Sequence, residues 1–572
     1  MHLPALPSVP PKGTSVTWQT FAPYFSALEE AEVTASERLE WLTYWSDLSR
    51  VLIEVLTSLS IEKSIDTTDE EKEAAYLDFV ENVWPHVMMA DQALKQRLLA
   101  MDFSDREDLA LVLRGMRNEA DLYRDENVPL QTELAKLDNK YDKITGSLKI
   151  DWEGEEHNLS QLGQYLTKKD RSVRERAWQA MMDLWLSQRE ALNELYADML
   201  KLREQVAKNA DLPDYRAYAF REYGRFDYTP EDCLTFHQAI ETAVVPAAQR
   251  IYQKKRSRLG LASLRPWDVQ VDTSDQPSLK PYQEQDELIH GSLNILNQVD
   301  PALGRHFAVM AEESLLDLQT RPGKALGGYC ATLPVKKRPF IFMNGVGLHD
   351  DVQTLLHEAG HAFHVFETTA LPLIWQTDVP MEFCEVASMS MELLAAPYLT
   401  DDFGGFYTAA EAARARIEHL EGIITFLPYM AVVDAFQHWV YTHAEEAMNP
   451  ENCDAAWDNL WSRFMAGVDW QGFDDARVTG WHRKLHIFSV PFYYIEYGMA
   501  QIGALQVWRN ARQNQPQAVA AYRQALALGS TKTLPELFAA AGAEFRFDSD
   551  MLHDLVALIE STIEELEGVA AA

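Results

Sequence analysis

One short segment, residues 355–364, constrains this chain more than any other. It reads LLHEAGHAFH, with apolar residues on both sides of paired histidines. The pattern predicts a buried helix, and positions four apart on a helix share a face. His357 and His361 can therefore hold one metal ion, and Glu358 is placed to take a proton from a water activated by that metal. The alternative is a pair of core histidines with ordinary hydrogen bonds.

A catalytic zinc site needs a third protein ligand in addition to the two histidines. His364 is close in sequence, but seven residues of helix rise by about 10 Å. Three histidines on one straight stripe of a helix cannot all reach one ion. We therefore expect His364 to pack in the core or to support the ligands from behind, and we expect the third ligand on another helix.

Residues 379–394 form that second helix in the prediction, and they carry three acids, Glu382, Glu385 and Glu392. The three acids lie on roughly one face of an otherwise apolar helix. Burying a carboxylate there is unfavourable unless something binds it. We expect one acid to bind the metal and the others to orient the histidines by hydrogen bonds. The spacing leaves Glu382 and Glu385 as alternatives for the ligand.

The rest of the chain predicts a mainly helical protein with a sizeable core. Of the 572 residues, 47% are hydrophobic, and apolar residues recur at spacings of three and four over most of the length. We expect an N-terminal helical lobe over residues 1–190 and a catalytic lobe over 191–572. The finer expectations are long helices at 30–59 and 76–99, a hairpin within 144–154, a loop at 264–279 and a strand at 339–344.

Charge and composition exclude several classes of partner. The net charge of -36 argues against nucleic acid, whose binding needs clustered Lys and Arg. We see no run of about 18 apolar residues, so no membrane span is expected. The four cysteines have no CxxC spacing, and the first residues lack a basic, apolar leader. These features predict a cytoplasmic protein, and nothing in the sequence defines its oligomeric state.

The motifs together resemble the thimet oligopeptidase and oligoendopeptidase F family of zinc peptidases, and above all the bacterial F-type oligoendopeptidases and Pz-peptidases. The resemblance rests on the HEAGHAFH segment and on Glu385 within Glu-Val-Ala-Ser. It extends over roughly residues 140–510, with similar segments at 143–146, 264–268, 339–344 and 491–498.

The resemblance implies a large helical ellipsoid with a deep substrate channel and a small β-sheet beside the metal helix. It implies one Zn²⁺ per chain, held by His357, His361 and Glu385, with Glu358 as the catalytic base. It also implies that a histidine and two tyrosines lie over the substrate, as His486, Tyr494 and Tyr497. Because the spacing varies among relatives, Tyr493 stays an alternative to Tyr494. We expect Glu392 and His364 to lie behind the metal ligands and to support them.

The strand 339–344, which carries Phe340 and Phe342, can be an ordinary core strand or a substrate-binding strand, and the resemblance favours substrate binding. An exposed strand edge can pair with the backbone of an extended peptide. The glycines Gly327 and Gly328 would form a mobile loop over the site. We therefore predict a zinc-dependent endopeptidase acting on short unstructured oligopeptides. The alternatives are a dipeptidyl carboxypeptidase of the same family and a catalytically inactive helical peptide-binding protein.

Overall fold

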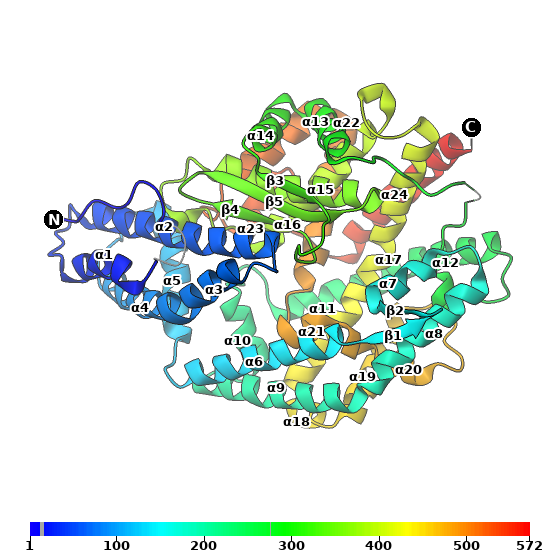
Figure 1. Ribbon diagram of the computed structural model, residues 1–572, viewed down its shortest axis with the longest axis horizontal. Coiled ribbons are helices and arrows are strands. Elements are labelled where there is room, and N and C mark those ends of the chain that lie inside the picture. The colour runs from blue at the N-terminus through cyan, green and yellow to red at the C-terminus, as the bar shows by residue number, and fades with distance from the viewer. Residues whose placement is uncertain (12–15, 275, 572) are drawn as a thin grey trace.

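The structure, a computed structural model, describes residues 1–11, 16–274 and 276–571. Helices hold 69% of the chain and the strands form small sheets, so the prediction of a mainly α protein is confirmed. Figure 1 shows the N-terminal helices at one end of the molecule and the C-terminus at the other. The prediction of a deep channel stays a prediction.

The N-terminal helices surround a hydrophobic cluster of their own, which includes Phe21, Trp41 and Trp45. The cluster draws its buried residues from positions 16–116 together with Leu373, whereas most later helices share one larger core. The lobe boundary near residue 190 stays a prediction. The helices are α1 (Trp18–Glu30), α2 (Arg38–Ile65), α3 (Glu70–Asp78), α4 (Trp84–Leu99) and α5 (Ala110–Leu122).

Both predicted long helices are present, and the end of the second at Leu99 is confirmed, but the first begins and ends later than predicted and the second is not regular throughout. The chain leaves helix after α1, where the Glu37 carboxylate accepts hydrogen bonds from the backbone and hydroxyl of Thr34 and sets a turn before α2. The predicted helix at 76–99 is interrupted by a π-helical turn, Phe79–Val83. Pro85 follows that turn and has no N–H to continue the regular ladder, so the chain widens there.

The predicted hairpin is present, as β1 (Lys149–Trp152) paired antiparallel with β2 (Glu155–Asn158). Its two-residue turn uses Glu153 and Gly154, both with positive φ, as tight hairpins require. The helices around it are α6 (Asn127–Gly146), α7 (Leu159–Gly163), α8 (Arg171–Ser187), α9 (Arg189–Asn209), α10 (Tyr215–Glu222), α11 (Pro230–Ala239) and α12 (Val245–Arg258).

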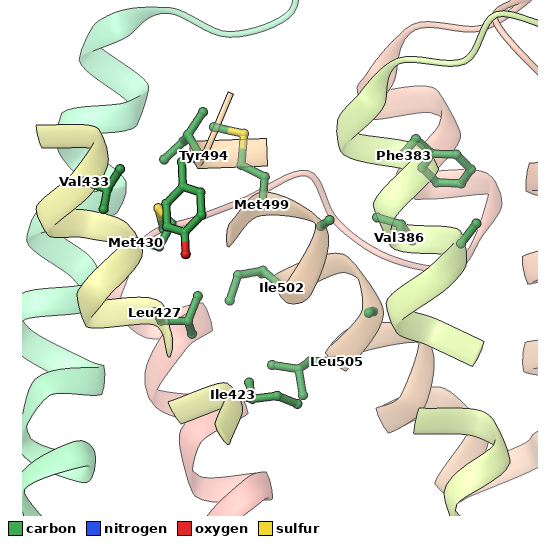
Figure 2. Close-up of a cluster of buried hydrophobic side chains, with 14 of the residues drawn as sticks. Phe383, Val386, Ile423, Leu427, Met430, Val433, Tyr494, Met499, Ile502 and Leu505 are labelled. Atoms are coloured by element: carbon green, nitrogen blue, oxygen red, sulfur yellow. The ribbon is translucent and has the colours of Figure 1, made fainter. Parts of the chain in front are cut away.

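Three long helices build the centre of the larger core. Figure 2 shows side chains of α16 (Met381–Ala395), α17 (Ala409–Thr442) and α22 (Ile495–Leu526) packed together. The most apolar window of α17 could cross a membrane by length and composition, but 61% of it is buried within the protein. The remaining helices are α13 (Gln285–Val299), α14 (Pro301–Glu312), α15 (His349–Thr368), α18 (Ala444–Ala447), α19 (Pro450–Phe464), α20 (Asp474–Val478), α21 (Leu485–Ser489), α23 (Leu534–Ala540) and α24 (Ser549–Ala570).

A three-stranded sheet lies against α15 (Figure 1) and corrects one expectation. Its order is β3 (Leu316–Gln319), β5 (Arg338–Gly345), β4 (Tyr329–Leu333), with β5 parallel to β3 and antiparallel to β4. The strand predicted at 339–344 is therefore central and paired on both sides, so the prediction that it offers an exposed edge was wrong. Phe340 and Phe342 are 8% and 0% exposed and belong to the core. Among the described residues, β4 is the edge strand on that side.

Candidate metal centre

Two closely packed helices bring the predicted ligands together. Helix α15 carries His357 and His361, and α16 carries Glu385. The helices approach at Gly360, where an added Cβ atom would lie 2.5 Å from Ser388 Cα and 2.6 Å from the Ala387 carbonyl oxygen. Only a glycine permits this separation, which brings the Glu385 carboxylate up to both imidazoles.

The three side chains have the geometry and chemistry that zinc needs. Glu385 Oε2 lies 3.4 Å from His357 Nε2 and 3.8 Å from His361 Nε2. The edges of a tetrahedral zinc site with nitrogen and oxygen ligands are about 3.3 Å, so one ion fits between these atoms. Glu385 is buried at 5% exposure, and a buried carboxylate facing two imidazoles is a suitable donor set for zinc. The residues present therefore fit the metal.

A second layer of hydrogen bonds fixes the ligands. Glu392 Oε1 accepts a hydrogen bond from His357 Nδ1 at 2.7 Å, which leaves Nε2 of that ring for a metal. The Nε2 atom of His419, on α17, lies 2.9 Å from the other oxygen of Glu392, Oε2. Ser388 Oγ donates to Glu385 Oε2 at 2.9 Å. Although burial opposes it, hydrogen bonds to Glu385 and Glu392 raise the pKa of His357 to about 10.

His419 and Ser388 were not identified from the sequence. Ser388 lies three residues after Glu385, so helical spacing could have found it. His419 comes from a distant helix, and no local pattern connects it to Glu392.

Glu358 lies beside this group and has an environment suited to a base. Its side chain is on the buried face of α15, and the residue is 8% exposed. Burial raises the pKa of Glu358 to about 7, with the nearby Glu385 and Glu392 carboxylates adding to the effect of burial. Such a carboxyl group can both accept and release a proton near neutral pH.

The alternative ligand Glu382 is directed elsewhere. Tyr228 Oη donates a hydrogen bond of 2.6 Å to Glu382 Oε1. Of the two acids that spacing left open, only Glu385 joins the histidines in the converging group. His364 is buried at 4% exposure, with its ring 6.0 Å from the ring of Phe383, and burial lowers its pKa to about 3. It packs in the core and stands outside the ligand group.

Tyr493 and Tyr497 lie near enough to the ligand group for Glu385 to affect their phenols. Burial raises the pKa of both phenols, to about 12 at Tyr497, and the Glu385 carboxylate adds to this effect. Their rings meet at a centroid distance of 5.3 Å. Which of Tyr493 and Tyr494 lies over a substrate stays a prediction. His486 completes the cluster, with its ring 6.0 Å from that of Tyr497.

Tyr494 contacts both this cluster and the apolar core, and its ring lies 4.8 Å from that of His486 and 5.6 Å from that of Tyr497. It is 6% exposed, and its ring contacts those of Phe426 and Tyr429 at centroid distances of 5.7 and 6.1 Å. Figure 2 shows its side chain among Leu427, Met430 and Met499. The expected role of Tyr494 over a substrate stays a prediction.

The edge strand β4 runs beside the base, and the glycine pair precedes it. Gly327 and Gly328 are exposed, and Gly327 has φ +95° with nothing within 4 Å of an added Cβ atom. Burial raises the pKa of the Cys330 thiol, and the second cause is the Glu358 carboxylate, which places this strand near the site.

A cavity of about 760 Å³ lies between α12, α17 and the loop at 269–279. It reaches Glu418, the neighbour of His419 on α17.

The chain is similar to known proteins in sequence and in fold. A PZ peptidase A solved with an inhibitor is 28% identical, with a TM-score of 0.87 over 97% of this chain and 98% of that one. A putative oligoendopeptidase F from Bacillus anthracis is 26% identical, with a TM-score of 0.83 over 98% of both chains. An oligoendopeptidase F homolog from Mycoplasma pneumoniae is 22% identical over 82% of this chain and 78% of its own length. The model of peptidase family M3 matches residues 164–556, and the chain therefore belongs to peptidase family M3.

Proposed function

We propose that this member of family M3 is a zinc-dependent endopeptidase that cleaves short unstructured oligopeptides. The observation that carries the proposal is the convergence of His357, His361 and Glu385 with the buried carboxyl group of Glu358 beside them. A helical scaffold with a dead site would have no reason to keep a base next to three ligands.

The chemistry follows from the positions of these side chains. A bound zinc ion would supply a Lewis acid that polarises the scissile carbonyl and acidifies a water molecule. Glu358 takes a proton from the attacking water and delivers it to the leaving amine. Tyr493, Tyr497 and His486 carry donors on the side of the ligand group, where negative charge develops on the carbonyl oxygen. Burial lowers the pKa of His486 to about 4, so at neutral pH the ring is neutral and carries one N–H.

The substrate backbone is proposed to pair with β4 rather than with the strand expected from the sequence. An extended peptide adds to a sheet edge through main-chain hydrogen bonds, and β4 is the edge strand near Glu358. The exposed loop at Gly327 and Gly328 leads directly into that edge. The cavity between α12 and α17 offers space for substrate residues further along the peptide.

The alternative within the same family is a dipeptidyl carboxypeptidase, which needs a cation for the substrate C-terminus. The cavity contains Lys255, Arg258 and Arg414, beside the acids Glu418 and Glu421. These positive charges could bind a substrate carboxylate, so the test below distinguishes the two kinds of cleavage.

The test uses a fluorogenic internally quenched peptide with blocked ends, with and without a chelator. We expect cleavage that chelation abolishes and added zinc restores. Mass spectrometry of the products from an unblocked peptide then identifies the cut. Internal cuts at varied distances from the C-terminus support an endopeptidase, and successive loss of C-terminal dipeptides supports the alternative. Full activity in protein shown to be free of metal would refute the proposal.

We also propose a cytoplasmic location. All four cysteines are unpaired, and Cys233 and Cys453 are buried thiols. A protein without disulfides suits a reducing compartment.

A further inference from the structure

We propose that Cys233, Asp434 and His438 form a second metal site, structural in role, that binds a zinc ion far from the peptidase chemistry in sequence. The ligand atoms of these three residues lie within 4.8 Å of one another, and all three residues are buried. Cys233 comes from α11, whereas Asp434 and His438 lie four apart on one face of α17. Thiolate, imidazole and carboxylate are all zinc ligands.

The distances within the cluster suit coordination better than hydrogen bonding. His438 Nε2 lies 3.2 Å from Asp434 Oδ2, near the tetrahedral edge of about 3.3 Å, yet it lacks the alignment of a hydrogen bond. Asp434 Oδ1 is buried and has no hydrogen-bond partner among the described residues. A carboxylate that binds through both oxygens would use this atom and complete four-coordination.

A fourth residue holds the carboxylate in place. His237 lies four residues after Cys233 on α11, and its Nε2 donates to Asp434 Oδ2 at 2.8 Å. A hydrogen bond of this kind orients a ligating carboxylate. Arg216 Nη1 lies 3.5 Å from His438 Nδ1, at the limit of a hydrogen bond. Because Arg216 is only half-buried, its guanidinium can turn to solvent when Nδ1 carries the proton and Nε2 binds the metal.

Charge balance supports the same conclusion. Asp434 is 0% exposed and forms no ion pair with Lys or Arg among the described residues. A buried carboxylate whose only partners are two histidines is more stable when a cation balances its charge. A divalent cation, one carboxylate and one thiolate sum to zero, with the Cys233 proton released to solvent on binding.

A metal bound at this site would hold in place the segment that carries Tyr493 and Tyr497. The His438 ring lies 5.3 Å from the ring of Phe492, which immediately precedes Tyr493. Phe492 has φ +69°, a conformation that a bulky residue adopts only when its surroundings enforce it. The backbone of Phe492 is held by Gln437 Oε1, which accepts from its N–H at 2.7 Å, and by Arg225, which donates to its carbonyl oxygen at 2.6 Å. Gln437 lies between Asp434 and His438 on α17, so a metal that joins α11 to α17 would also fix the position of Gln437.

Metal content of the full chain tests the proposal. We expect two equivalents of zinc in the wild type after dialysis against metal-free buffer, and one in His357→Ala/His361→Ala, which lacks the peptidase ligands. This variant leaves the second cluster untouched, so the test holds even if cluster variants fold poorly. One equivalent in the wild type and none in the double variant would overturn the second site while leaving the peptidase proposal intact.

Cobalt substitution identifies the ligands. The three peptidase ligands include no thiol, but Cys384 Sγ lies 3.4 Å from His361 Nδ1. Cys384→Ala is therefore needed beside the other variants, and it should retain a thiolate-to-cobalt charge-transfer absorption in the near ultraviolet that comes from the second site. We expect the band in the wild type and in His357→Ala/His361→Ala, and its loss in Cys233→Ala. The matched control is Cys453→Ala, which removes another buried thiol and should retain the band. A band that survives Cys233→Ala, or that is absent from the wild type, refutes the assignment.

Discussion

At the scale of single residues, the two carboxyl groups Glu358 and Glu385 have separable tasks. Glu358→Gln preserves shape and leaves the three ligands, so zinc content should stay at the wild-type level. Turnover should fall by about 100-fold or more, because general acid–base catalysis contributes factors of that size. The measurements are kcat on a quenched peptide and zinc content of the same preparation.

Glu385→Gln and Glu382→Gln provide the matched comparison, since both replace a buried acid on α16 with its amide. We expect Glu385→Gln to lose zinc and Glu382→Gln to keep it, because Glu382 bonds to Tyr228. The reverse pattern would show that the wrong acid has been assigned to the metal.

The tyrosines give a second residue-scale prediction. Tyr493→Phe and Tyr497→Phe each remove one hydroxyl near the ligand group, and loss of one oxyanion donor costs on the order of 100-fold in kcat. KM should change little, because the interaction forms mainly in the transition state. Tyr494→Phe serves as the control and should leave kcat within a few-fold of wild type. Equal effects at Tyr494 and Tyr493 would contradict the role proposed for Tyr493.

The sequence identified the histidines and the glutamates because regular helices carry them, and helical spacing is readable. It could not choose between Tyr493 and Tyr494, because both precede the first residue of α22. Helical periodicity does not apply to irregular backbone, and the positive φ of Phe492 redirects the chain just before them.

At the scale of elements, the contact between α15 and α16 is set by Gly360. Gly360→Ala would place a methyl group against backbone atoms of α16, which cannot move aside as a side chain can. We expect a loss of about 1–3 kcal/mol in the free energy of unfolding and weaker zinc binding, because Glu385 shifts away from the histidines. Urea denaturation and zinc titration measure the two effects.

Gly115→Ala is the matched control for that substitution. Gly115 also lies within a helix, α5, and nothing lies within 4 Å of its added Cβ atom. Replacing a helical glycine with alanine in open space should stabilise the protein by about 0.5–1 kcal/mol. Similar behaviour of both variants would mean that the helix contact does not control the site.

The same scale shows why one strand was found but misplaced. The apolar run at 339–344 indicates a strand, and local sequence is sufficient for that. Its partners in the sheet are β3 and β4. The alternation of side chains along a strand does not determine which strands lie next to each other. A strand that is buried on both faces also has the same apolar sequence pattern whether it is central in the sheet or at its edge.

At the scale of the whole molecule, a buried histidine couples folding to pH. His482 is 2% exposed, and burial lowers its pKa from 6.5 to about 3. Between these values the unfolded chain binds a proton that the folded chain does not. Stability should therefore fall as pH drops from 6.5 towards 3, by up to about 1.4 kcal/mol per pH unit from this group.

His482→Gln tests that coupling, because an amide can still donate to Asn193 Oδ1. Urea denaturation at several values between pH 7 and pH 4.5 should show a shallower loss of stability in the variant than in the wild type. Since both proteins contain the same metal ligands, acid release of zinc cancels in the comparison. Parallel curves would exclude His482 as the source.

Substrate size is the second property of the whole molecule. A folded protein has already paired its backbone and cannot add to β4, so we expect free peptides to be cut and folded domains to survive. The experiment compares one peptide with the same sequence displayed in a loop of a stable protein. Comparable cleavage rates for the two would refute this limit.

The position of β4 at the edge of the sheet has a consequence for inhibitors. Main-chain groups of an edge strand alternate in direction, so only every second residue of a bound peptide turns its N–H towards β4. A single N-methyl group walked along a peptide should therefore weaken binding at alternate positions and leave the positions between them nearly unaffected. Such a scan would define the register and direction of the bound peptide without altering the protein, and side-chain changes in the enzyme could not imitate it.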